Sequence, residues 1–222
     1  MTSLKPRFNA ETPMLPSPVA LADLRFRALM SDAAWSQLPL AIRRRFAKRL
    51  ANGDTIVYAG RVTATAMSRA GMILAQLGRL IGGPLPTTCD ADVPSVVTVT
   101  EDFSSGGQVW TRLYARRRGF PQIIHSAKRF AGPTGLEEHV GRGIGMTLTV
   151  CTTERALIFK SAGFFIELGR WRFYLPTSFC PGALTVTHAE IDPTRFSFTL
   201  DLVHPWLGQL IHQHAVFEET RT

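Results

Sequence analysis

Three residues of this 222-residue sequence have the types and the spacing of a small ligand site. Trp110, Arg112 and Tyr114 alternate along one predicted strand, so their side chains share one face and the guanidinium lies between two aromatic rings. A guanidinium stacked in this way keeps its N–H donors free for a carboxylate or a phosphate. We therefore predict that these residues bind a ligand, with Arg112 pairing its charged end and Arg61 as a weaker candidate for the same role.

Arg112 also has a structural interpretation. Buried arginines commonly pair with acidic side chains of the same chain, and Glu137, Glu138 and Asp201 occur in strands predicted further along. In that case Arg112 stabilises the core and binds no ligand. The internal pair is the commoner arrangement in proteins, so both interpretations stay open at this point.

The histidines suggest a metal site only weakly. His212 and His214 are two residues apart on one predicted strand and His204 lies across the preceding turn, a spacing that permits zinc coordination. There is no H-E-x-x-H or C-x-x-C motif and no acidic residue at a fixed spacing, so we predict solvent-facing histidines and no metal or other cofactor. The alternative to a binding protein is an enzyme, or an accessory domain of a redox enzyme, that acts on a hydrophobic substrate with His188, His204 and His214.

The cysteines and the N-terminus are typical of a cytoplasmic protein. The 3 cysteines are an odd number without a catalytic signature, which indicates a reducing compartment. The first 20 residues are rich in proline and contain no apolar signal core, so we predict a disordered arm followed by a single domain over residues 21–222. No run of about 18 apolar residues occurs, and we expect no transmembrane helix.

The excess positive charge lies in the first part of the chain. Residues 1–88 contain 12 Lys and Arg against 4 Asp and Glu, whereas residues 89–222 contain 13 against 13. We predict a mainly helical basic layer over residues 21–88. Its main elements are a helix over 39–50 that Asn52-Gly53 ends, a strand over 55–65 and a helix over 67–81.

The two longer helices of this layer suggest a third functional alternative. The helix over 39–50 has arginines on its outer face, and the helix over 67–81 is apolar around most of its surface. Together they are compatible with weak peripheral attachment to the inner face of a membrane, although a solvated helix face and a helix buried against a sheet explain them as well. Nucleic-acid binding is not expected, because no nucleic-acid motif accompanies the arginines.

The pattern of strand and turn signals over residues 89–222 predicts one long antiparallel β-meander. Ten candidate strands lie between Ser95 and Phe217, with tight turns such as Ala162-Gly163 and Pro205–Gly208 between them. Ten strands with one apolar face must curl, split into two sheets or be covered. We therefore predict an α+β fold in which the N-terminal helices pack on a large, strongly curved antiparallel sheet, as a half-barrel or a helix-grip or lipocalin-like cavity.

Several short motifs, in order and spacing, extend over Phe26–Glu219. They include Ile42-Arg43-Arg44-Arg45-Phe46, Tyr58-Ala59-Gly60-Arg61, Trp110-Thr111-Arg112, Gly135-Leu136-Glu137-Glu138 and Pro205-Trp206-Leu207-Gly208. This pattern resembles the uncharacterised bacterial domain of unknown function numbered 4166, which occurs alone or fused behind a saccharopine-dehydrogenase-like reductase. The resemblance implies no catalytic residue and no ligand, but it implies a stand-alone bacterial domain that serves a partner reductase encoded elsewhere. The sequence departs from the family pattern near its end, where Gln213 and Ala215 replace an expected aromatic residue and glycine.

These observations favour a non-enzymatic binding module. The predicted ligand is a small apolar or amphipathic anion that lies inside the curved sheet, beside Arg112. This prediction requires that the interior is not filled completely by side chains.

Overall fold

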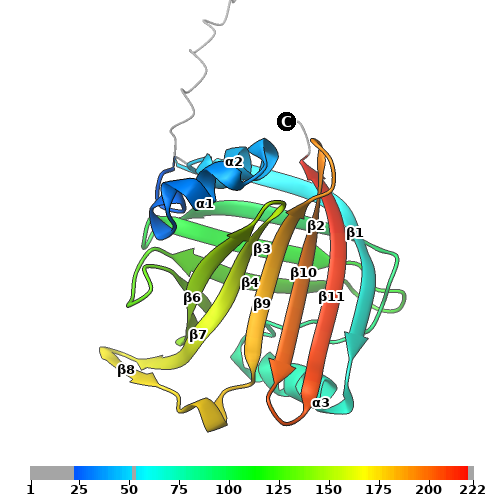
Figure 1. The fold of residues 1–222 in the computed structure, drawn as a ribbon. Coiled ribbons are helices and arrows are strands. Elements are labelled where there is room, and N and C mark those ends of the chain that lie inside the picture. The colour runs from blue at the N-terminus through cyan, green and yellow to red at the C-terminus, as the bar shows by residue number, and fades with distance from the viewer. Residues whose placement is uncertain (1–22, 52–53, 220–222) are drawn as a thin grey trace, which may run out of the picture.

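The computed structural model describes residues 23–51 and 54–219, and it shows an antiparallel β-barrel (Figure 1). Ten strands form the barrel wall in the order β6-β5-β4-β3-β2-β1-β11-β10-β9-β7, and pairing between β6 and β7 closes it. The short strand β8 is attached to the side of β7. The N-terminal arm predicted over residues 1–20 and the helix end predicted at Asn52-Gly53 lie outside the described residues.

The strands alternate inward apolar and outward polar residues along most of their length, as the wall of a barrel requires. The strands are β1 (Thr55–Met67), β2 (Val93–Asp102), β3 (Gly107–Tyr114), β4 (Gln122–Arg129), β5 (Glu137–Gly141), β6 (Ile144–Thr153), β7 (Ala156–Leu168), β8 (Trp171–Tyr174), β9 (Ala183–Glu190), β10 (Arg195–His204) and β11 (Gly208–Glu219). The helices are α1 (Asp32–Gln37), α2 (Leu40–Ala47) and α3 (Arg69–Gly78), with 3-10 turns η1 (Arg27–Leu29), η2 (Arg79–Ile81) and η3 (Thr177–Phe179). No helix among these described residues is long and apolar enough to cross a membrane.

The prediction of a half-barrel covered by a helical layer is imprecise in two respects. First, the wall closes, because an open sheet would leave unpaired backbone groups and an apolar face at its edges. Second, β1 belongs to the part of the sequence predicted as mainly helical, yet it lies between β2 and β11 in the wall. The helices therefore cover the two ends of the barrel and do not form a layer on one face (Figure 1).

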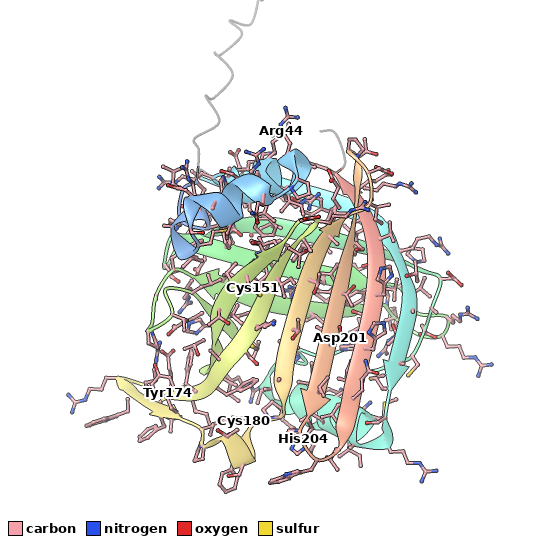
Figure 2. The ribbon with its side chains drawn as sticks, in the orientation of Figure 1. Arg44, Cys151, Tyr174, Cys180, Asp201 and His204 are labelled. Carbon is pink, nitrogen blue, oxygen red and sulfur yellow. The ribbon has the colours of Figure 1, made fainter. Side chains whose placement is uncertain are left out.

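Helices α1 and α2 cover the upper end of the barrel in Figure 1. Ser31 caps α1 by accepting a hydrogen bond from the Ala34 amide at 3.2 Å. In α2 the side chains of Ile42 and Phe46 are buried, while Arg44 points away from the barrel (Figure 2). The amphipathic pattern of α2 thus directs Ile42 and Phe46 into the upper end of the barrel and Arg44 to solvent, while the guanidinium of Arg45 lies 3.6 Å from the ring centroid of Phe196.

Helix α3 and η2 cross the opposite end of the barrel. The α3 backbone lies so close to β11 that a Cβ atom on Gly71 would be 2.0 Å from the carbonyl oxygen of Leu210. At the other end of this segment, a Cβ atom on Gly141, which has a φ of +124°, would be 2.4 Å from the carbonyl oxygen of Ile81. The segment therefore spans from β11 to the β5–β6 turn and forms a floor under part of the barrel.

Strand β7 shows why the predicted turn at Ala162-Gly163 is wrong. The chain continues as one strand, and its pairing with β6 skips Ala162 in a β-bulge. Beyond the bulge β7 leaves β9 and pairs instead with β8 through residues 165–168. The sequence did not predict β8 because all its residues are exposed, so no apolar alternation marks it.

Candidate functional site

The half of the barrel interior nearest to α3 is hollow. A cavity of about 300 Å³ lies there, at the lower end of the range for small-molecule sites. Its lining is predominantly apolar, with Leu74 of α3, Ile124 of β4, Met146 of β6 and Leu202 of β10 among its members. Two further voids inside the barrel are only about 10 Å³ each, too small for a ligand.

The other half of the interior is filled by aromatic rings around His188. The ring centroid of His188 lies 5.3 Å from that of Phe46, 5.8 Å from that of Trp110 and 5.4 Å from that of Phe198. Phe46 comes from α2, so the helix completes this packed half from outside the wall. The barrel therefore has a solid half under α1 and α2 and a hollow half above α3.

A cluster of buried charged side chains lies where the two halves meet. Lys128 Nζ is 3.0 Å from Glu138 Oε2, and Arg112 Nη2 is 3.8 Å from Glu138 Oε1. Arg112 also donates a hydrogen bond from Nη1 to Ser126 Oγ at 3.0 Å. Arg112, Ser126 and Glu138 line the cavity, whereas Lys128 points toward the rings of the packed half.

The cluster holds two cationic side chains against one anionic side chain. Burial opposes the ionisation of Glu138, but the charges of Lys128 and Arg112 and hydrogen bonds to the carboxylate lower its pKa to about 2. Burial lowers the pKa of Lys128, and the ion pair with Glu138 opposes that shift. Burial, and then the charges of Arg45, Lys128 and Arg112, lower the pKa of His188 well below 6.5, so this ring is neutral. Arg112 is thus a cation at the cavity wall whose nearest carboxylate is already paired with Lys128.

The cavity opens between the floor segment and η3. Beyond residue 160 of β7 and before residue 185 of β9 the two strands no longer pair, so the wall is split on this side. Phe179 of η3 lines the cavity and is 76% exposed, which places it at the opening. The cavity is therefore a pocket with an inner end at Arg112 and a mouth at Phe179.

Of the predicted site residues, Arg112 and Tyr114 line this cavity. Trp110 lies in the packed half, with its ring centroid 5.8 Å from Arg112 Cζ. The second ring beside the guanidinium is Phe198 at 5.7 Å, on the opposite wall of the barrel, and not the expected Tyr114. Arg61 lies on the outer surface, donates a hydrogen bond to the carbonyl oxygen of Asp92 and does not share the cavity.

The comparison with protein families identifies the chain. Residues 38–217 match the family model described as "Domain of unknown function (DUF4166)". The matched residues extend from α2 to near the end of β11. The chain belongs to the DUF4166 family. A comparison with curated proteins finds no match. The description of the DUF4166 family states no activity, so a functional argument for this member starts from its cavity.

Two residues that were not among the predicted site residues matter for this DUF4166 cavity. Gln213 is 3% exposed and lines the cavity, and its Oε1 atom has no hydrogen-bond partner among the residues that the structure describes. Its signal in the sequence was the departure from the expected family pattern at this position. Lys128 follows Ile124 and Ser126 on the inward face of β4, so counting by twos from Ile124 would have placed it inside.

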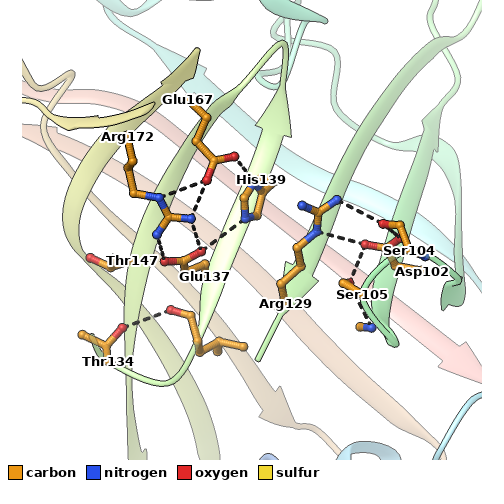
Figure 3. Close-up of polar contacts among 12 residues, drawn as sticks. Asp102, Ser104, Ser105, Arg129, Thr134, Glu137, His139, Thr147, Glu167 and Arg172 are labelled. Atoms are coloured by element: carbon orange, nitrogen blue, oxygen red, sulfur yellow. Dashed lines mark hydrogen bonds and ion pairs between the residues drawn. The ribbon is translucent and has the colours of Figure 1, made fainter. Parts of the chain in front are cut away.

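Glu137 and Glu138 of this DUF4166 member point to opposite sides of the wall. Glu137 is buried on the outer side, where Arg172 Nη2 is 3.1 Å and His139 Nε2 is 3.3 Å from its Oε2 atom (Figure 3). Arg172 also pairs with Glu167. These contacts fasten β8 to the outside of β5 and β7, beside the mouth of the cavity, and give Glu137 a structural role.

The histidines of the alternative enzyme hypothesis lie far from one another in this DUF4166 fold. His188 is inside the barrel, His214 interacts with Thr63 Oγ1 at 2.6 Å on the outer side, and His204 lies at the β10–β11 turn. Within residues 23–51 and 54–219, no group of three or more His, Cys, Asp or Glu side chains is arranged to hold a metal ion. These three residues therefore do not form one site.

The neutral state of His188 predicts a pH-dependent stability. Because its pKa is lowered in the folded protein, protonation favours the unfolded chain once the pH falls below about 6.5. Between about pH 7 and pH 5, the free energy of unfolding should therefore decrease toward acid by up to about 1.4 kcal/mol per pH unit from this residue. Urea denaturation of wild type and His188→Phe at several pH values measures the difference.

The His188→Phe variant should lack this part of the slope, because phenylalanine suits the aromatic surroundings and does not titrate. His125, which is exposed on the outer side of β4, provides the matched control, and His125→Gln should keep the wild-type slope. Equal slopes for wild type and His188→Phe would show that His188 accepts a proton within the folded barrel.

Proposed function

We propose that this protein is a non-enzymatic binding module for a small apolar or amphipathic anion, held in the cavity next to α3. The observation that supports the proposal most strongly is the charge of the cluster at the inner end of the cavity. Two cations and one anion meet there in surroundings shielded from water. A buried cation without a counter-charge is strongly unfavourable, and an anionic ligand beside Arg112 supplies the missing charge.

The lining of the cavity specifies the rest of the ligand. Most of the wall is apolar, so the body of the ligand is a hydrocarbon. Gln213 offers an unpartnered amide oxygen to a hydroxyl or amide group of the ligand. With roughly 30 Å³ for each water-sized unit, a cavity of about 300 Å³ suits a ligand of the size of a medium-chain carboxylate.

The cellular setting of this function follows from the family resemblance and the cysteine pattern. We infer a bacterial protein that works in the cytoplasm beside a saccharopine-dehydrogenase-like reductase encoded elsewhere. In that setting the module would hold an apolar substrate or product of the partner enzyme. Mass spectrometry of solvent extracts from the purified protein identifies a co-purified ligand.

Replacing Arg112 with methionine is expected to weaken anion binding without loss of the fold. The variant keeps the one-to-one pair of Lys128 and Glu138, so its melting temperature should equal or exceed that of wild type. Isothermal titration with octanoate should show at least about tenfold weaker binding, the factor for one lost charge-assisted contact. Titration with octanol, which has no charge, should show similar affinity for both proteins.

A second variant tests the cavity itself. Leu200 lines the cavity and is only partly buried, so Leu200→Trp should fill the space while leaving Arg112 in place. This variant should lose both octanoate and octanol. A strongly lowered melting temperature of Arg112→Met would contradict the proposal, because it would identify Arg112 as a core residue. Unchanged octanoate binding in both variants would place the ligand elsewhere.

A further inference from the structure

The end of the barrel at which the cavity opens exposes many large apolar side chains. They come from α3 and η2, from β8 and η3, and from the β10–β11 turn, close to where Figure 2 labels Tyr174, Cys180 and His204. We call six of them the mouth surface, each 58–78% exposed: Ile73, Leu77, Leu80, Trp171, Phe179 and Trp206. Burial against a sheet was one interpretation of the helix over 67–81, but the outer face of this segment is exposed.

The composition of the mouth surface suits an interface between water and lipid. Two of the chain's 4 tryptophans, Trp171 and Trp206, are exposed here, whereas Trp35 and Trp110 are buried. Tryptophan is enriched at membrane interfaces because its ring is apolar and its N–H group hydrogen-bonds to water or lipid headgroups. Proteins that remain free in water rarely expose so many apolar side chains at one end.

The charges at this end are complementary to anionic lipids. The connecting segments 68–92, 115–121, 141–143, 169–182 and 205–207 contain 8 arginines and 2 aspartates, with no lysine or glutamate. Arg172 is paired with Glu137 and Glu167, but Arg69, Arg79 and Arg170 form no ion pair with the described acidic residues. Residues 89–222 have no net charge, yet this end of the barrel is strongly basic. The reason is that most of the acidic residues lie on the strands and not in the connecting segments at this end.

We propose that the α3 end of the barrel docks on a bilayer that contains anionic lipids. The tryptophans and leucines enter the interface, and the arginines contact the headgroups. Phe179 belongs to both the mouth surface and the cavity lining, so docking places the cavity mouth against the acyl chains. Docking depends only on this surface, whereas entry of a lipid-derived anion into the cavity rests on the proposed binding function.

The position of α2 makes it possible to distinguish docking through the α3 end from a nonspecific attraction between the positively charged protein and anionic lipids. The arginines of α2 lie at the opposite end of the barrel from α3 (Figure 1). One flat membrane therefore cannot contact both helices at once. Variants of the two ends should behave differently in the same assay.

Flotation of the purified full chain with vesicles tests the proposal. Wild type should float with vesicles of phosphatidylcholine and phosphatidylglycerol at low salt, less at high salt, and weakly with phosphatidylcholine alone. Arg79→Ser with Arg170→Ser should reduce binding to the anionic vesicles by roughly fivefold per arginine. Trp171→Ala with Trp206→Ala should reduce it by about tenfold or more, and the tryptophan emission of wild type should shift to the blue on binding.

The matched control is Arg44→Ser with Arg49→Ser, which removes two exposed arginines at the α2 end. This variant should bind anionic vesicles as wild type does. Arg112→Met should also float normally, so a failed ligand proposal leaves the docking result unaffected. No flotation of wild type at low salt, or loss of flotation in the α2 variant alone, would overturn the proposal. Concentration-dependent dimerisation abolished by the tryptophan variant, without flotation, would assign the surface to a second copy of the chain.

Discussion

Replacing Glu138 with glutamine is expected to lower the free energy of unfolding by about 3–5 kcal/mol, the usual effect of removing one partner from a buried ion pair. Glutamine has nearly the shape of glutamate, so packing is preserved and the loss is electrostatic. Without the carboxylate, Lys128 and Arg112 remain as two buried cations at the inner end of the cavity. Equilibrium denaturation in urea measures the change.

The double variant Lys128→Met with Glu138→Gln is the control for this result. It removes the cation that the carboxylate neutralised, so most of the lost stability should return. In Glu138→Gln, saturating octanoate should also restore part of the stability, because a bound anion replaces the missing charge. A loss below about 1 kcal/mol in Glu138→Gln would mean that Lys128 is already neutral or that water reaches the cluster.

Truncating Phe46 to alanine is expected to have an effect of similar size, about 3–5 kcal/mol. Phe46 is 2% exposed, and its ring centroid lies 5.2 Å from that of Phe26 and 5.7 Å from that of Phe159. Because this side chain joins α2 to the packed half of the barrel, its loss leaves a cavity under the helix. Thermal and urea unfolding of Phe46→Ala measures the effect.

Leu40 provides the comparison on the same helix. Its side chain is 52% exposed, so Leu40→Ala should change the free energy of unfolding by no more than about 0.5 kcal/mol. Similar small effects for Phe46→Ala and Leu40→Ala would show that α2 is not coupled to folding of the barrel. In either case the cavity near α3 lies beyond the packed half, and octanoate binding by the folded fraction should be unchanged.

Much of the local structure follows from alternation along the chain. The two-residue period of a strand placed Arg112 and Tyr114 on one face, and the structure has this arrangement. The turn at Ala162-Gly163 was the exception. A β-bulge and a tight turn both favour small residues, so the local signal did not distinguish them.

The candidate site was predictable only in part. Glu138 was one of three acids considered for Arg112, and local sequence offered no reason to choose it over Asp201, which lies on another strand. The actual cluster joins side chains of β3, β4 and β5, and Gln213 of β11 approaches the same cavity from a distant strand. Such neighbours are brought together by strand pairing, which is not encoded in any one segment.

The sequence by itself determined the strand periodicity, the amphipathic helices, the membership of the family and which residues of each strand face inward. The tertiary structure alone decided that the sheet closes, with Tyr58 of β1 opposite Glu219 of β11, and that one half of its interior stays hollow. It also decided that arginines from four separate connecting segments share one end of the barrel. The reason is that alternation reflects local backbone geometry, whereas closure and packing depend on contacts between residues far apart in the chain.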